Sequence, residues 1–202
     1  MGYWSQKMTK KIITKEDILS LEAYEKIRPD FKAKMIELKN KRRIALGPYV
    51  NFYFENYETM FYQIHEMLRI EKGGDAQIED ELHAYNPLIP NGTELTATLM
   101  FEIEDKNKRA ALLGQLGGVE DMIYMQVGSQ RIQALPEKDQ ERSKPGGRTA
   151  SVHFIHFPFD AALINAFKNP ATEIYIGINQ AAYGHMSILN KETREELGRD
   201  FL

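Results

Sequence analysis

The chain has 202 residues, a formal net charge of −3, and 43% hydrophobic against 27% charged residues, values typical of one globular domain or of one domain with a small appendage. This balance gives no overall field that would draw the chain to nucleic acid or to an anionic membrane surface. The absence of cysteine excludes a cysteine-ligated iron–sulfur cluster, a thiol nucleophile and disulfide bonds. No apolar run approaches the roughly 20 residues of a membrane-spanning helix, and the N-terminus lacks the apolar core of a signal peptide.

The N-terminal third predicts helices. We expect residues 1–13 to be disordered or weakly ordered, with Met8 as an alternative start. Thr14, with Asp17 three residues later, has the pattern of a capping box and predicts a helix over residues 15–27. Pro29 suits the first turn of a second helix, which the basic residues between Lys39 and Arg43 would close.

A strand region over residues 44–54 follows, interrupted at Gly47-Pro48, where glycine and proline favour a turn. Residues 55–71 have the apolar spacing of a strong helix, and a short acidic helix is expected over residues 76–85. Residues 86–92 contain two prolines and an Asn-Gly pair, so they form a turn rather than a continuation of the helix.

The C-terminal half contains a faint internal repeat. Thr96–Phe101 is answered by Thr149–Phe154, Arg109–Leu113 by Asp160–Ile164, and Ile123–Val127 by Ile174–Ile178, at offsets of 53, 51 and 51 residues. Each copy reads strand, helix, strand, strand. The alternation of Leu95, Ala97, Leu99, Phe101 and Ile103 with mostly polar residues predicts a sheet with one packed face under helices and one more open face.

These elements predict an α+β fold, in which N-terminal helices precede a mostly antiparallel sheet built from two β-α-β-β repeats. We expect one domain over residues 14–202, with a helical part at 14–93, a duplicated sheet at 94–189 and a terminal helix at 190–202. Residues 136–148 form a charged, solvated linker between the repeats. The matched order of the blocks predicts one continuous sheet with both repeat helices on the same face, and it makes Phe101 equivalent to Phe154 and Leu112 equivalent to Leu163.

Several longer motifs allow a family comparison. They are Leu19–Tyr24, Arg28-Pro29 with Phe31, Arg43–Pro48, Tyr62–Glu71, Tyr85–Gly92, Val152–Phe154 and Tyr183–Met186. From about Ile13 to Leu189 the chain resembles an uncharacterised bacterial family whose members are often encoded beside a rubrerythrin-like protein and an iron–sulfur oxidoreductase. The resemblance implies a cytoplasmic protein in a peroxide- or oxygen-stress setting, with one of those two proteins as a partner. It implies no reaction and no cofactor.

Polar side chains on the helix over residues 55–71 are the first site candidates. Tyr62, Glu66 and Arg69 lie at i, i+4 and i+7 and share one side of the helix. A phenol, a carboxylate and a guanidinium together could bind a carboxylate or a phosphate. The alternative interpretation is a Glu–Arg surface pair beside a tyrosine that leans on the core.

The histidines are the second set of candidates. No two of them have a helical metal-ligand spacing, and His153 and His156 would face opposite sides of a strand. A metal site would therefore need convergence of His153, His185 and a carboxylate such as Glu66. The alternative interpretation is that the histidines are hydrogen-bonded at a sheet surface.

Two functions remain open at this point. One is a non-catalytic accessory or partner-binding protein, and the other is a metal- or small-ligand-binding enzyme that uses the open sheet face. For the second function we expect a ligand site where the helix over residues 55–71 and the loop over residues 86–92 meet that face. Its predicted residues are Glu66, Arg69, Tyr85, Asn86, His153 and His185.

Overall fold

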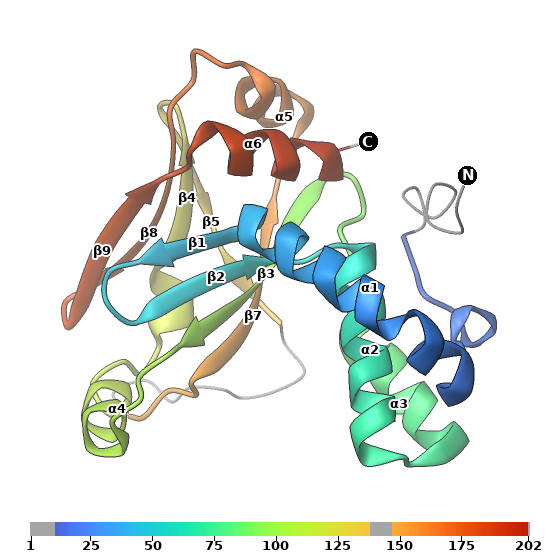
Figure 1. Cartoon of the computed structure of the whole chain (residues 1–202). Coiled ribbons are helices and arrows are strands. Elements are labelled where there is room, and N and C mark those ends of the chain that lie inside the picture. The colour runs from blue at the N-terminus through green and yellow to red at the C-terminus, as the bar shows by residue number, and fades with distance from the viewer. Residues whose placement is uncertain (1–10, 138–146, 202) are drawn as a thin grey trace.

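The computed structural model describes residues 11–137 and 147–201 (Figure 1). The predicted disorder of the N-terminus falls mainly on residues 1–10, and most of the predicted linker falls on residues 138–146, so both predictions lie largely outside the described residues. Ile13, which we placed in the weakly ordered segment, is buried with 1% of its surface exposed. The fold class is confirmed, because helices come first and antiparallel strands follow.

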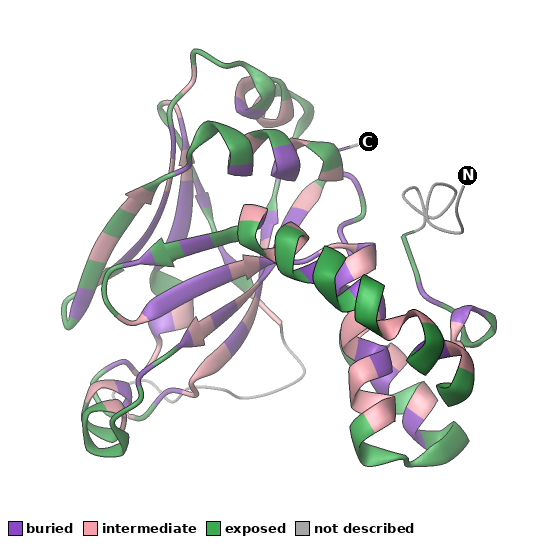
Figure 2. Ribbon diagram, in the orientation of Figure 1, coloured by how far each residue is buried: buried purple, intermediate pink, exposed green. Residues whose placement is uncertain are grey.

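The N-terminal helices form a small layer of their own. After a 3-10 turn η1 (Lys15–Asp17) come α1 (Leu21–Lys41), α2 (Tyr57–Glu71) and α3 (Gly74–Tyr85), followed by a 3-10 turn η2 (Asn86–Leu88). A hydrophobic cluster containing Ile13, Phe31, Met35 and Phe61 packs α1 against α2. Figure 2 shows that the outward side of α1 is largely exposed.

The two helices predicted between residues 15 and 43 are wrong as separate elements. The Thr14–Asp17 capping box is present, but it opens only the short turn η1. The long helix begins after Ser20, whose side-chain oxygen accepts a hydrogen bond from the backbone N–H of Ala23, and Pro29 lies inside that helix. Because proline has no N–H, the carbonyl of Glu25 lacks its usual intrahelical donor, a cost that packing against α2 outweighs.

The strands form two antiparallel sheets. Sheet A has the order β1-β2-β3-β7-β6, and sheet B has the order β5-β4-β8-β9. The strands of sheet A are β1 (Arg43–Leu46), β2 (Val50–Phe54), β3 (Glu94–Phe101), β6 (Leu135–Pro136) and β7 (Val152–Pro158). Those of sheet B are β4 (Ile123–Val127), β5 (Gln130–Gln133), β8 (Ile174–Gln180) and β9 (Tyr183–Ile188).

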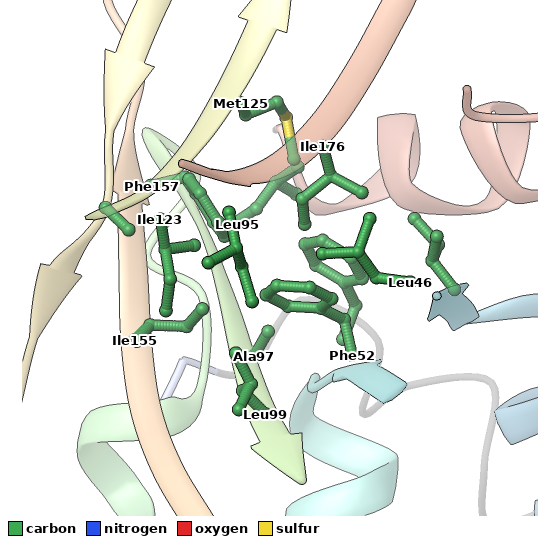
Figure 3. Close-up of a cluster of buried hydrophobic side chains, with 14 of the residues drawn as sticks. Leu46, Phe52, Leu95, Ala97, Leu99, Ile123, Met125, Ile155, Phe157 and Ile176 are labelled. Atoms are coloured by element: carbon green, nitrogen blue, oxygen red, sulfur yellow. The ribbon is translucent and has the colours of Figure 1, made fainter. Parts of the chain in front are cut away.

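The main hydrophobic core lies between the two sheets (Figure 3). Phe52, Leu99 and Phe157 of sheet A and Met125 and Ile176 of sheet B are all fully buried in it. The alternation predicted for β3 is therefore confirmed, but its packed face lies against a second sheet rather than under helices.

The remaining helices lie around the ends of the sheets. They are α4 (Lys106–Leu113), α5 (Ala161–Lys168) and α6 (Lys191–Leu197), with the 3-10 turns η3 (Val119–Met122) and η4 (Gly198–Asp200). Figure 1 shows α4 and α5 at opposite ends of the sheets, so the prediction that the repeat helices share one face is wrong. The prediction of one continuous sheet is also wrong.

The repeat itself is laid out across both sheets. Its equivalent strands pair with each other, β3 with β7 in sheet A and β4 with β8 in sheet B. Each copy thus starts in sheet A, passes through its helix and ends in sheet B. After the first copy the chain returns to sheet A. It runs from β5 of sheet B directly into β6 of sheet A, within the seven residues 130–136.

The predicted equivalence of Phe101 and Phe154 is also wrong. Leu99 lies opposite His153 and Thr98 opposite Phe154, and residues directly opposite each other share a face of the sheet. Phe101 is therefore in the two-sheet core, whereas Phe154 packs on the other side against the helical cluster. Because side chains alternate along a strand, aligning the two repeats one residue out of register assigns each residue to the wrong face of the sheet. Leu112 and Leu163 do both pack, partly buried, against the two-sheet core.

This arrangement predicts that replacing each of two phenylalanines of β7 by alanine lowers the free energy of unfolding by different amounts. Phe157→Ala empties a site inside the two-sheet core, where the side chain has no exposed surface, and should lower the free energy of unfolding by about 3–5 kcal/mol. Phe154→Ala should cost clearly less, because that ring is only partly buried. Urea denaturation of the two variants and the parent measures both values, and equal losses would contradict the assigned register.

Candidate functional site

Glu66, the central residue of the predicted site, joins α1 to α2. Its carboxylate accepts hydrogen bonds from Arg28 Nε at 2.7 Å and Nη2 at 2.9 Å, and from the Tyr24 hydroxyl at 2.8 Å. The Arg28 guanidinium lowers the pKa of Glu66, against the opposing effect of burial. Burial, with a smaller contribution from Glu66, raises the pKa of Tyr24. The carboxylate is thus occupied by the packing of the helix pair.

The other predicted residues of α2 have similar roles. Arg69 Nε donates to Glu25 Oε1 of α1 at 2.6 Å. The ring of Tyr62 meets Phe31 edge-on, with 5.5 Å between centroids. His65 Nδ1 lies 2.7 Å from the Phe61 carbonyl, and His65 Nε2 accepts from the backbone N–H of Leu19 at 3.0 Å. The alternative interpretation from the sequence is a Glu–Arg surface pair beside a tyrosine that leans on the core. Tyr62 does pack against the helical cluster, but Glu66 and Arg69 each pair with a residue of α1 instead of forming a surface pair on α2.

Tyr85 and Asn86 lie at the end of α3. The side chain of Asn86 pairs with both backbone groups of Ile13, accepting from its N–H at 2.8 Å and donating to its carbonyl at 2.9 Å. Asn86 thereby holds the N-terminal segment against the helices. Tyr85 packs against the helical cluster, and burial raises its pKa.

The two predicted histidines lie at one end of the two-sheet core. His153 is buried, with Nε2 at 2.9 Å from Thr149 Oγ1. The ring of Phe101 contacts both His153 and Tyr183, at 6.3 and 6.1 Å between centroids, and Tyr183 contacts His185 at 4.3 Å. The structure therefore brings the two histidines to the same region, where the rings of Phe101 and Tyr183 lie between them.

The six predicted residues thus fall into three separate places: the α1–α2 interface, the end of α3 and the end of the two-sheet core. Within the part of the chain that the structure describes, no three His, Asp or Glu side chains are arranged to hold a metal ion. In the same part, no helix is both long and apolar enough to cross a membrane.

Sequence reasoning missed the role of Tyr183. Its hydroxyl donates to the carbonyl of Leu46 at 2.7 Å and accepts from the N–H groups of Tyr49 and Val50 at 2.9 and 3.1 Å. It therefore holds the β1–β2 turn of sheet A against β9 of sheet B. Gly47 in that turn has a φ of 63°, and a Cβ there would lie 2.4 Å from the His185 ring, so both the backbone and the close approach require glycine.

A cleft of about 380 Å³ lies where α1, the start of α2, the Ile89-Pro90 loop and the C-terminal segment meet. It touches the region of the predicted site, but none of the six predicted residues lines it. Its charged groups form mutual pairs: Lys34 with Glu58 at 2.8 Å, Lys41 with Glu37 at 2.9 Å, and Arg199 with Glu196 at 2.7 Å. Four cationic and four acidic side chains line the cleft, so it favours neither sign of ligand. They are Lys11, Lys34, Lys41 and Arg199, and Glu37, Glu58, Glu196 and Asp200.

The outer face of sheet B has a different character. The strand register places ten residues on the side that points away from the two-sheet core: Tyr124, Gln126, Arg131, Gln133, Tyr175, Gly177, Asn179, Gly184, Met186 and Ile188. Arg131 is the only charged residue among them. Met186 and Ile188 are 59% and 56% exposed, which is unusual for large apolar side chains on neighbouring positions of one strand face.

At the centre of this outer face three residues form a stack. Gly177 has no side chain, and the Tyr124 ring lies across it so closely that a Cβ would be 2.5 Å from the ring. The Arg131 guanidinium lies over the Tyr124 ring, 3.9 Å from its centroid. A cation held over an aromatic face at this distance is favourable, and it fixes both side chains.

The outer face of sheet A provides a contrast. There Arg43 Nε donates to Asn51 at 2.9 Å, and the Tyr53 hydroxyl donates to Glu102 at 2.6 Å. These polar groups satisfy one another, and charges of both signs are present. Among the described residues, the outer face of sheet B has no comparable network of charged groups. Its exposed or partly exposed side chains include those of Arg131, Tyr175, Met186 and Ile188.

Comparison with known proteins gives the following. A family model described as "Protein of unknown function (DUF3501)" matches residues 12–201. The chain is also similar to a solved structure of a protein of unknown function from Burkholderia pseudomallei K96243, with 34% sequence identity and a TM-score of 0.86, over 94% of this chain and 99% of that one. None of the curated proteins matches the chain.

The Glu66 contacts predict a specific acid response. Because the pKa of Glu66 is lowered in the folded state, its contribution to stability is complete above the ordinary value of 4.5 and is lost as the pH falls through the folded value. Glu66→Gln should therefore lower the stability at pH 7 and differ less from the parent at low pH. Glu22→Gln, which removes an exposed pair with Lys26, is the control and should change little. Denaturation curves between pH 3 and 7 measure this, and a gap that widens on acidification would contradict it.

Proposed function

The chain belongs to the DUF3501 family, and we propose that it is a non-catalytic accessory protein that binds another protein through the outer face of sheet B. The observation that carries this proposal is the composition of that face. Protein interfaces are enriched in tyrosine, methionine and arginine, and their centres are poor in lysine, aspartate and glutamate. Its ten residues include two tyrosines, an exposed methionine, an exposed isoleucine and one arginine, and none of the ten is a lysine, an aspartate or a glutamate.

The distribution of the predicted site residues supports this function over the enzyme alternative. We expected an enzyme to gather Glu66, Arg69, His153 and His185 in one pocket. In the structure the first two hold α1 to α2, and the two histidines lie at the end of the two-sheet core. A site that binds and orients a substrate needs its polar groups to converge.

The charge on the face favours a different protein over a second copy of this chain as the partner. Among the described residues no carboxylate forms an ion pair with Arg131. Glu173, the acidic residue directly before β8, accepts a hydrogen bond from the Tyr175 hydroxyl at 2.7 Å. A partner that presents an apolar surface with a free carboxylate would satisfy Arg131, whereas the same face of a second copy has no carboxylate among its residues.

The family resemblance suggests what this partner is. It implies a cytoplasmic setting of oxidative stress or redox metabolism, with a rubrerythrin-like protein or an iron–sulfur oxidoreductase as the partner. The chain has no cysteine with which to ligate a cluster of its own, so in this proposal the redox chemistry belongs to the partner. The role of this protein is to bind and position that partner.

The proposal predicts the effect of one charge on the face. Ile188→Glu should weaken binding to the partner at least tenfold, because it places a carboxylate in an apolar contact that excludes water. Ile70→Glu is the matched control, since Ile70 is 66% exposed on α2 and is not part of the face. The measurement is calorimetric titration of each variant with the purified rubrerythrin-like protein and with the purified iron–sulfur oxidoreductase from the same organism.

The outcomes separate the two parts of the proposal. Binding of the parent that survives Ile188→Glu would show that the outer face of sheet B is not the interface. Absence of binding to either redox protein would refute the redox partner. A dimer of the parent that Ile188→Glu converts to a monomer, seen by light scattering, would make a second copy the occupant.

A further inference from the structure

His156 lies between two carboxylates on the side of sheet A that faces away from the two-sheet core. Its Nδ1 is 3.0 Å from Glu94 Oε2, and its Nε2 is 3.0 Å from Glu137 Oε2. The three side chains come from three segments: Glu94 from β3, His156 from β7, and Glu137 from the residue after β6. All three are mostly buried, with 17%, 18% and 26% of the side chain exposed for His156, Glu94 and Glu137.

The geometry determines where the protons are. An ionised carboxylate can only accept a hydrogen bond, so each ring nitrogen must donate one. A neutral imidazole has a single N–H group and can donate to one carboxylate, whereas an imidazolium has two N–H groups and can donate to both. When both carboxylates are ionised, the two contacts at hydrogen-bond distance therefore require the charged ring. We propose that His156, as an imidazolium, is a proton-dependent latch that fastens β6 to sheet A.

Among the described residues, a short strand pairing also attaches the segment that this latch holds to sheet A. β6 has two residues and pairs only with β7, where Leu135 lies opposite His156. The backbone N–H of Glu137 adds one hydrogen bond, to the carbonyl of Phe154 at 2.9 Å. The same segment continues β5, so it is the part of the chain that crosses from sheet B to sheet A. The latch therefore secures the connection between the two sheets at one point.

The direction of the pH response follows from the environment of the ring. Burial lowers the pKa of His156, but the hydrogen bonds and charges of Glu94 and Glu137 outweigh burial and raise it above 6.5. Among the described residues these two are the charged groups that act on the ring. The stability that the latch contributes is thus complete below about pH 6.5, provided that the carboxylates stay ionised, and it is lost as the pH rises through the folded value.

Two nuclear magnetic resonance measurements test the latch on the full chain. The ¹⁵N shifts of the imidazole report which nitrogens carry protons, and we expect both to be protonated at pH 6. Hydrogen exchange of the Glu137 amide, corrected for the intrinsic effect of pH, reports the opening of β6. Its protection should fall between pH 6 and 9 by about tenfold for each unit by which the folded pKa of His156 exceeds the unfolded value.

The variants make the test specific. His156→Gln should abolish this pH dependence, whereas His83→Gln, a change at an exposed histidine on α3, should leave it intact. Glu137→Gln leaves the ring with one carboxylate and should move the transition to lower pH, which keeps the test usable if His156→Gln does not fold. The proposal would be overturned by a neutral His156 ring at pH 6. It would also be overturned if the corrected hydrogen-exchange protection of the Glu137 amide in the parent did not change with pH.

Discussion

The buried guanidinium of Arg42 holds together the parts of this fold that lie farthest apart in the sequence. Only 1% of its surface is exposed. It donates to the carbonyl of Phe54 from Nε and to that of Glu55 from Nη2, each at 2.9 Å, and it pairs with the carboxylates of Glu196 and Asp200. Burial raises the pKa of the Asp200 carboxyl, which the charge of Arg42 opposes. Removing one member of such a pair leaves a buried charge, at a cost of about 3–5 kcal/mol.

This cluster also explains how the helical layer and the sheets come into register. Arg42 is the C-cap of α1, and the two carbonyls it binds lie at the junction of β2 and α2. The carboxylates come from α6 and η4 at the other end of the chain. One side chain thus fixes where the first helix ends, where the second begins and where the C-terminus is held. The basic residues from Lys39 to Arg43 indicated a helix end, but a charge count could not show that one of them is buried among carboxylates more than 150 positions away.

Contacts between segments that are distant in the sequence also explain which features of the sheets could be predicted and which could not. The order of the repeat blocks, the helix over residues 55–71 and the alternation along β3 depend on local periodicity, and the structure has all three. Strand pairing depends on contacts between distant segments. A repeat shows which strands are equivalent and leaves open whether they pair with each other or with strands of their own copy. Phe154 illustrates the sensitivity, because a shift of one residue moved it from one core to the other.

The candidate site failed to assemble for a related reason. Glu66 and Arg69 lie off the apolar stripe of α2, which makes them site candidates by sequence, but α1 covers that side and supplies Arg28 and Glu25 as partners. A polar residue off the stripe is a site candidate only if no second element covers it, and periodicity does not report coverage. The outer face of sheet B posed the opposite problem. Its residues alternate regularly with the core residues of β4 and β8, but whether a layer covers them is again a tertiary property.

The proposed interaction face and the proposed latch are joined by one stretch of chain, which runs from β5 into β6. β5 carries Arg131 and Gln133 on the outer face of sheet B, and three residues after Gln133 the chain reaches Pro136, at the end of β6. Four opposed residue pairs with β4 hold β5 itself, so an open latch removes an anchor at one end without releasing the strand. The Arg131 guanidinium also rests on Tyr124, which belongs to β4 and is seated on Gly177 of β8. The stack is therefore supported by the two central strands of sheet B, and deprotonation of His156 should loosen the crossing between the sheets while leaving the centre of the face in place.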